Sequence, residues 1–225
     1  ATLCDQIDMN KAAEPSIKGG LDGGTIYLTT ADRWGNMVSF IHSIFSVYGS
    51  AVAIPPYGMI LHNRGVAFSL EQDSPNVVAP RKRPFHTIIA GFVMQGGEPL
   101  MTFGNMGGAV QPETHAQHMV NVIDHGMNIQ MTTDAARFTH SQNSNQLSLE
   151  QSLYNLVGRA LQVKGHDVRS VNGGSVGGYQ GILFTKDPNL PVPVYSLQSI
   201  EEDHPVNGIY RGGSDHRKDG GAVGW

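Results

Sequence analysis

Few residues in this sequence could act as a nucleophile, and most of them lack the neighbours that would activate one. The G-x-S-x-G match at residues 173–177 precedes the strand signal at 181–184 and not a predicted helix, whereas the turn that presents a catalytic serine leads from a strand into a helix. The single cysteine, Cys4, lies in a polar segment with nothing nearby to activate a thiol. Thr25, in contrast, follows Gly23 and Gly24 at the first residue of a predicted strand, and it remains as the candidate nucleophile.

The spacing of the candidate ligands disfavours a metal site. Glu113, His115 and His118 lie close in sequence, but the glutamate lies outside the two histidines and the histidines are three residues apart. A zinc-binding H-E-x-x-H helix has a different order and spacing. No other histidine has the sequence spacing of a metal ligand, so we expect no metal site.

A second local feature is the glycine pair Gly107-Gly108, which follows an apolar run at 100–103. Successive glycines allow two backbone N–H groups to approach a developing oxyanion, because no side chain obstructs them. A tight turn between a strand and a helix would need the same residues. Spacing alone leaves both interpretations open.

Hydrophobic periodicity predicts the elements that must hold these residues. Residues 25–31 alternate with a period of two, Gly35-Asn36 is typical of a turn, and residues 37–45 follow as a second strand. A β-hairpin is therefore predicted. Further strand signals lie at 58–61, 87–94, 100–103 and 181–184.

Apolar residues at helical spacing predict two helices. One covers residues 116–123 and ends at Gly126, and the other covers residues 149–161 and ends at Gly165. Each helix has one apolar stripe and should pack on a sheet face. The order of strands, helices and strands predicts an α+β layered domain, preceded by a polar, glycine-ending tail over residues 1–24.

The overall composition argues against several other classes of protein. A net charge of −4 and a pI near 6.2 give no electrostatic basis for binding nucleic acid or an anionic membrane. The short basic run Arg81-Lys82-Arg83 fits a solvated turn better than a phosphate site. No apolar stretch approaches the roughly 18 residues of a membrane span. A single cysteine rules out an internal disulfide and leaves the compartment open.

Four segments, in chain order, resemble the gamma-glutamyltranspeptidase family. Residues 24–39 are similar to the opening of the small subunit, 83–88 to the loop that holds the substrate carboxylate, 103–108 to the double-glycine oxyanion loop, and 213–225 to the C-terminal strand. The resemblance runs from about residue 22 to the end. It implies the four-layer α-β-β-α sandwich of N-terminal-nucleophile hydrolases.

The resemblance implies that the chain cuts itself before Thr25. The Thr25 hydroxyl would attack the Gly24 carbonyl, and hydrolysis of the resulting ester would leave Thr25 with a free α-amino group. That amine, with a pKa of about 7.7 to 8.0, could accept the hydroxyl proton when Thr25 attacks an amide substrate. Residues 1–24 would then end the large-subunit part of a precursor, and residues 25–225 would form the catalytic small subunit.

The resemblance also implies roles for three further residues. Ser43 falls where the family has a threonine whose hydroxyl supports the nucleophile, although an ordinary polar strand position is the alternative. Gly107 and Gly108 fall on the oxyanion loop. Neither a metal nor an organic cofactor is implied, because amine, hydroxyl and oxyanion donors complete the mechanism.

The predicted substrate pocket departs from the family pattern. Typical members carry Asn-Asn-x-Met-Asp-Asp-Phe-Ser where this chain has residues 62–69, and Ala67 replaces the aspartate that binds the glutamyl amino group. An ammonium group taken out of water needs an opposite charge, so this change removes the basis for gripping a zwitterionic glutamyl headgroup. Arg64 instead favours an anion nearby.

Two further pocket positions differ. The paired serines that hold the substrate α-carboxylate appear as His86 and Thr87, which could still donate hydrogen bonds to it, or equally begin a strand. An asparagine of the oxyanion side falls at Phe45. We therefore expect the amide-cleaving machinery to act on a different acyl group or with looser glutamyl selectivity.

Three functions remain open at this stage. The first is a gamma-glutamyltransferase-like hydrolase or transferase of glutathione metabolism, and the second is an acylase of the cephalosporin type with the same mechanism. The third is an uncut, non-catalytic relative, because Thr25 is internal in the sequence. The start lacks an initiator Met and a signal peptide, which suggests a segment of a longer precursor. The expected partners are an N-terminal large subunit and a small-molecule amide, and the oligomeric state is open.

Overall fold

The computed structural model describes residues 24–187 and 206–224. The strands are β1 Gly24–Ala31, β2 Met37–Phe45, β3 Ala53–Ile54, β4 Met59–Ile60, β5 Gly91–Gln95, β6 Glu98–Met106, β7 Phe138–Ser141, β8 Gln146–Glu150, β9 Asp167–Val171, β10 Gly178–Lys186 and β11 Gly208–Ser214. The α-helices are α1 Gln111–Ile123, α2 Ile129–Asp134 and α3 Gln151–Val163.

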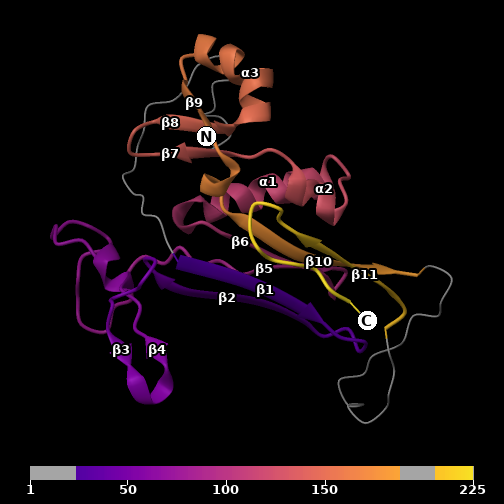
Figure 1. Ribbon diagram of the computed structural model, residues 1–225, viewed down its shortest axis with the longest axis horizontal. Coiled ribbons are helices and arrows are strands. Elements are labelled where there is room, and N and C mark those ends of the chain that lie inside the picture. Colours follow the sequence, from indigo (N-terminus) through magenta and orange to yellow (C-terminus); the bar gives the residue numbers. More distant parts are fainter. Residues whose placement is uncertain (1–23, 188–205, 225) are drawn as a thin grey trace.

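Four sheets organise the described residues. The largest is antiparallel with the order β11-β10-β6-β5, and the β1-β2 hairpin packs against its β6 and β10 strands. Helices α1 and α2 contact the same sheet, and Figure 1 shows them across it from the hairpin. Strands β7, β8 and β9 form a separate sheet covered by α3, and β3-β4 is a small projecting hairpin. The mixed helices and sheets confirm the α+β class.

The two faces of the β1-β2 hairpin differ in what covers them. On the inner face the Tyr27 ring lies over Gly104, where an added Cβ would come 2.3 Å from Tyr27 Cδ2. Next along the strand, Thr29 Oγ1 lies 2.5 Å from Thr102 Oγ1. The outer face carries large apolar side chains that are exposed in the described part of the chain: Ile26, Leu28, Val38 and Phe40.

The apolar core lies between the four-stranded sheet and its helices. Met101, Phe103 and Tyr179 on the sheet and Ile129 at the start of α2 form its buried cluster. The rings of Phe103 and Tyr179 are 6.2 Å apart. Burial of such aromatic side chains supplies much of the stability of a domain, so this cluster anchors the strand that leads to Gly107.

The predicted hairpin is confirmed, with the strand beginning one residue earlier, at Gly24. The runs at 100–103 and 181–184 lie within the longer strands β6 and β10. The signal at 58–61 shrinks to β4. The strand predicted over 87–94 begins only at Gly91, because the Ile89 N–H donates to the Gln111 side chain (2.9 Å) instead of to a neighbouring strand.

Both predicted helices are present, but the prediction of an apolar buried stripe is wrong for α1. Its buried residues are polar: Gln111, Thr114, His115 and His118. Val120 and Ile123, which belong to the predicted stripe, are exposed. Bonds from Ile89 N to Gln111 Oε1, from Asn105 N to His115 Nε2 and from Thr114 Oγ1 to the Val110 carbonyl pair much of this face, and buried polar groups cost little when they are paired. In α3, Leu156 is likewise exposed.

The C-terminal strand predicted over 213–225 is wrong beyond Ser214, where β11 ends. The chain leaves the sheet because the Asp215 side chain accepts a hydrogen bond from the backbone N–H of Tyr179 (2.9 Å). Strands β7, β8 and β9 and helix α2 were not predicted from the periodicity. Most of the predicted tail lies outside the described residues.

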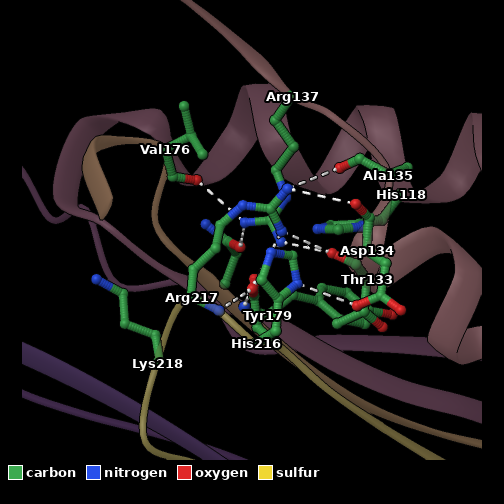
Figure 2. A network of polar contacts seen from close by, with 12 residues as sticks. His118, Thr133, Asp134, Ala135, Arg137, Val176, Tyr179, His216, Arg217 and Lys218 are labelled. Carbon is green, nitrogen blue, oxygen red and sulfur yellow. Dashed lines mark hydrogen bonds and ion pairs between the residues drawn. The ribbon is translucent and has the colours of Figure 1, made fainter. Parts of the chain in front are cut away.

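A buried ionic network holds the C-terminal loop against the helices (Figure 2). Asp215 pairs with Arg137 through Oδ2 and with Arg217 through Oδ1, the latter at 3.1 Å. Arg217 in turn makes two bonds of 2.7 Å to the Glu150 carboxylate, and the Arg137 backbone N–H donates to the same carboxylate at 2.7 Å. Every charge in this network therefore has an opposite charge beside it.

This pairing changes the acidity of Asp215. Burial alone would raise the pKa of its carboxyl, but the Arg137 charge and the hydrogen bonds to Asp215 outweigh burial and hold that pKa below its usual value. The carboxylate therefore stays ionised in the fold. Among the described residues no helix is both long enough and apolar enough to cross a membrane.

Candidate active site around Thr25

Thr25 and Ser43 lie opposite each other in the hairpin. Thr25 Oγ1 donates a hydrogen bond of 3.0 Å to Ser43 Oγ, and Ser43 Oγ donates one of 3.2 Å to the Gly24 carbonyl oxygen. One hydroxyl group thus contacts both the candidate nucleophile and the carbonyl group that the nucleophile would attack. The sequence-predicted residues Gly24, Thr25 and Ser43 are brought together.

The backbone around the Gly24–Thr25 bond is irregular. The hairpin register shifts between these two residues, and Phe45, which is paired with Gly24, has a φ of 75°. A non-glycine residue in that left-handed region costs on the order of 1–3 kcal/mol and persists only where its surroundings enforce it. A Cβ added at Gly24 would lie 3.2 Å from the Ser46 carbonyl oxygen, so glycine is favoured before Thr25.

Arg64 reaches this site from the short 3-10 helix Arg64–Ala67. Its Nη2 donates to Ser43 Oγ at 2.8 Å and its Nη1 to Thr87 Oγ1 at 3.1 Å. The guanidinium carbon lies 4.8 Å from the centre of the Phe45 ring. Arg64 is only 2% exposed, yet it takes part in none of the ion pairs found between described residues. Burial accordingly lowers its pKa.

Asn63 fixes the segment that carries Arg64, and it was missed in the sequence-based prediction. Its Oδ1 accepts from Ser46 N at 3.0 Å and its Nδ2 donates to Ser46 Oγ at 2.8 Å. Its backbone N–H also donates to Ile44 O at 3.2 Å. These bonds hold the segment against the end of β2. The available signal was that Asn63 matches an asparagine of the family segment.

The two predicted carboxylate-binding residues behave differently. Thr87 is buried and accepts the hydrogen bond from Arg64, so it lies in the site. His86 is exposed, and its Nδ1 lies 2.6 Å from the Pro84 carbonyl oxygen. Ala67 brings no charge, and its carbonyl accepts from Asn76 Nδ2. The structure therefore groups Thr87, but not His86, with Arg64 and Ser43.

Gly107 and Gly108 form the turn between β6 and α1. Their φ values are 135° and 65°, which side chains rarely adopt. A Cβ at Gly107 would also come within 2.8 Å of Val110 Cγ2. Backbone geometry alone thus accounts for both glycines, and it leaves their N–H groups unobstructed by side chains of their own.

The histidines that sequence analysis weighed as metal ligands lie in the core. His115 Nε2 accepts from Asn105 N at 3.0 Å, and the His118 ring centre lies 3.7 Å from that of Tyr179. Burial lowers the pKa of His115 to about 4, and burial followed by the Arg137 charge lowers that of His118 to about 2. Glu113 accepts a hydrogen bond from the His140 backbone. Within the described residues no three metal-ligating side chains gather.

Comparison with known proteins gives a consistent family assignment. The family model described as gamma-glutamyltranspeptidase matches residues 2–225. The chain is 33% identical over 216 residues to the glutathione hydrolase-like YwrD proenzyme of Bacillus subtilis, covering 94% of this chain and 38% of that protein. It is 32% identical to the oxamate amidohydrolase proenzyme of Klebsiella pneumoniae, covering 99% of this chain and 39% of that protein.

Solved structures of related proteins match the fold of this chain. Cephalosporin acylase from Bacillus halodurans matches with a TM-score of 0.76 and 38% identity, over 88% of this chain and 34% of that chain. A gamma-glutamyltranspeptidase mutant from Helicobacter pylori matches with a TM-score of 0.70 and 26% identity, over 85% of this chain and 99% of that chain. The sequence thus spans less than two fifths of the length of the two curated proenzymes.

Proposed function

The chain belongs to the gamma-glutamyltranspeptidase family, and on that premise we propose that it is the catalytic part of a self-cleaving amidase or acyltransferase whose nucleophile is Thr25. One observation carries the proposal. The Ser43 hydroxyl lies between Thr25 Oγ1, at 3.0 Å, and the Gly24 carbonyl oxygen, at 3.2 Å. Nucleophile, proton relay and scissile carbonyl are therefore adjacent before any cut is made.

Self-cleavage converts this arrangement into the working site. Thr25 Oγ1 attacks the carbonyl carbon of Gly24, the C–N bond breaks, and the chain continues through an ester. Water hydrolyses that ester and leaves a Gly24 carboxylate and a Thr25 amine. The bulge at the Gly24–Thr25 bond and the left-handed Phe45 support this step, because strain relieved on cleavage lowers its cost.

In turnover the Thr25 amine takes the hydroxyl proton as Thr25 attacks an amide substrate. The acyl group passes to Thr25 and then to water or an amine. The N–H groups of Gly107 and Gly108 would stabilise the oxyanion, and one such donor is worth about 2.7–4 kcal/mol. Inward residues of β1 support this role: Thr29 contacts Thr102 and Tyr27 covers Gly104, so Thr25 is expected over the end of β6.

Residues 25–225 form the small subunit in this proposal, and residues 1–24 end the preceding large-subunit part. The hairpin and the four-stranded sheet supply two β layers, and α1 and α2 cover one side. The exposed outer face of the hairpin, with Leu28 and Phe40 on it, supports a large subunit that would complete a four-layer α-β-β-α sandwich. The short length relative to proenzyme relatives supports the same two-part precursor.

The substrate is an amide whose acyl group need not carry an α-ammonium. Ala67 offers no negative charge to such a group, whereas Arg64 and Thr87 provide donors for an anion. This favours a second candidate within the same mechanism, an acylase or amidohydrolase acting on non-glutamyl amides. Similarity to proteins named cephalosporin acylase and oxamate amidohydrolase supports it.

The test compares the precursor and its Thr25 variants. Thr25→Ser keeps a hydroxyl and should cleave itself and turn over amides at a reduced rate, whereas Thr25→Ala should do neither. Release of aniline dye from a gamma-glutamyl anilide and from simple acyl anilides would rank the acyl groups. Wild-type protein that stays uncut and inert toward every anilide would favour a non-catalytic relative instead.

A further inference from the structure

The starting observation is a buried charge that has no counter-ion among the residues that the structure describes. Arg64 is 2% exposed, and its contacts are two hydroxyls, Ser43 Oγ at 2.8 Å and Thr87 Oγ1 at 3.1 Å, and the Phe45 ring. Buried charges are normally paired, because desolvation is costly. A guanidinium held in this way interacts strongly with any negative charge that forms near it.

The hydrogen bonds of Ser43 show on which group the Arg64 charge acts. A serine hydroxyl has one proton to donate and two lone pairs to accept. Three donors share these two lone pairs of Ser43 Oγ, namely Thr25 Oγ1, the Phe45 backbone N–H at 3.0 Å and Arg64 Nη2. The acceptor for the serine proton is the Gly24 carbonyl oxygen. The donors on its oxygen thus direct the Ser43 proton toward the scissile bond.

From this geometry we propose that Arg64 is a positioning residue for self-cleavage, which holds Ser43 Oγ so that the Ser43 proton is directed at the Gly24 carbonyl oxygen. The inference rests on the proposed self-cleavage. A charged donor on a hydroxyl oxygen draws electron density from it and strengthens the O–H as a donor. Arg64 therefore stabilises, through Ser43, the negative charge that develops on the carbonyl oxygen.

The step balances without an added reagent. Thr25 Oγ1 bonds to the Gly24 carbon while the carbonyl π pair moves to oxygen, which takes the Ser43 proton. Ser43 takes the Thr25 hydroxyl proton in exchange. The C–N bond then breaks with its electron pair on the Thr25 nitrogen, which receives the proton from the intermediate's hydroxyl as the C=O bond re-forms. The product is the ester, and Ser43 is unchanged.

Two features of the site suit Arg64 to this task. Thr87 and the Phe45 ring fix the guanidinium, so that little motion is needed during reaction. Ala67, three residues along, supplies no carboxylate that would neutralise it. A carboxylate beside Arg64 would compete with Ser43 for its donors and weaken the effect.

The experiment follows the cut in freshly synthesised full precursor by intact mass over time. Arg64→Met should slow the appearance of the fragment that begins at Thr25 by about tenfold or more, as expected for a lost charge-assisted contact. Arg64→Lys should recover part of the rate. Arg211→Met is the matched control, because Arg211 is an exposed arginine that donates to a hydroxyl outside the Thr25 site, Thr185 Oγ1, and its cleavage rate should stay within about threefold of wild type.

Two readouts separate this role from a structural one. The thermal midpoints of Arg64→Met and Arg64→Lys should lie close together although their cleavage rates differ. Hydroxylamine, which cleaves esters, should not restore the Arg64→Met rate, because the defect precedes ester formation. The inference would be overturned if Arg64→Met cleaved itself at the wild-type rate, or if hydroxylamine restored that rate. It would also be overturned if Arg64→Met and Arg64→Lys were equally slow and equally destabilised relative to wild type. An uncut wild-type precursor would instead count against the proposed function.

Discussion

Arg64 and Arg137 are buried to nearly the same extent, 2% and 1% exposed, in opposite surroundings. Arg137 pairs with Asp215, and the neighbouring Arg217 pairs with Glu150, so charge is balanced on the spot. Arg64 meets two hydroxyls and an aromatic ring. The charges of the network are already paired in the resting fold. Arg64, which lacks a counter-ion among the described residues, would be stabilised more strongly by a negative charge that develops beside it during a reaction.

The two regions also differ in how the chain reaches them. The network joins residues far apart in sequence, such as Arg137 and Asp215, and ties the C-terminal loop to the helices. The Thr25 site is built from the hairpin and from the segments that carry Arg64 and Thr87. We propose that the first region secures the fold and that the second serves the chemistry, a division that substitutions can test.

The largest expected effect is on stability. Arg137→Met would remove the cation paired with Asp215 Oδ2 and leave Arg217 as the cation beside this buried carboxylate, and breaking a buried ion pair costs about 3–5 kcal/mol. Urea unfolding of the precursor should show a lower midpoint, while the rate of self-cleavage per folded molecule stays near wild type. Arg64→Met should show the reverse pattern. Equal loss of stability in both variants would erase the distinction drawn between the two arginines.

Acid should destabilise the region around the network first. His115 and His118 are neutral in the fold, with pKa values of about 4 and about 2, whereas unfolding restores a value near 6.5. The unfolded chain therefore binds more protons below pH 6.5, and stability falls as pH drops from about 6.5 to about 4. Thermal midpoints across this range measure it.

Two comparisons refine the pH test. His115→Gln, whose amide oxygen could accept from Asn105 N, should flatten the curve between pH 6.5 and 4. Asp215 has a lowered pKa, so its contribution is present above its unfolded pKa, about 3.9, and is lost as pH falls below that value through its folded one. A midpoint that does not change from pH 7 to pH 4 in wild type would contradict the neutral, buried state of these histidines.

The smallest expected effect concerns Gly24, the residue before the proposed nucleophile. A Cβ at Gly24 would approach the Ser46 carbonyl oxygen to 3.2 Å, so Gly24→Ala should shift the scissile carbonyl away from Ser43. We expect cleavage to slow by about tenfold, which corresponds to about 1.4 kcal/mol. The time course of the cut, followed by gel, measures it. An unchanged rate would indicate that the Gly24 position is not constrained by Ser46.

The sequence predicted the parts of the molecule that depend on local pattern. Alternation and the Gly35-Asn36 turn predicted the hairpin that sets Thr25 opposite Ser43. Gly126 and Gly165, both with positive φ, follow the two predicted helices as expected of glycines at helix ends. Such features follow from a few neighbouring residues, and tertiary contacts did not override them.

Features that depend on distant contacts could not be read from the sequence. The buried face of α1 is polar because Gln111 and His115 bond the backbone of other segments, which periodicity does not report. The end of β11 depends on an Asp215 contact with Tyr179, far away in sequence. Arg64 was predicted to favour an anion, but its contact with Ser43 required the fold.

The central claim is tested most directly by the mass and N-terminal sequence of the fragments from active, mature protein. We predict a fragment that begins at Thr25 with a free α-amino group, and a single uncut chain from the Thr25→Ala variant. Mature protein that hydrolyses amides while Gly24 remains joined to Thr25 would contradict the account.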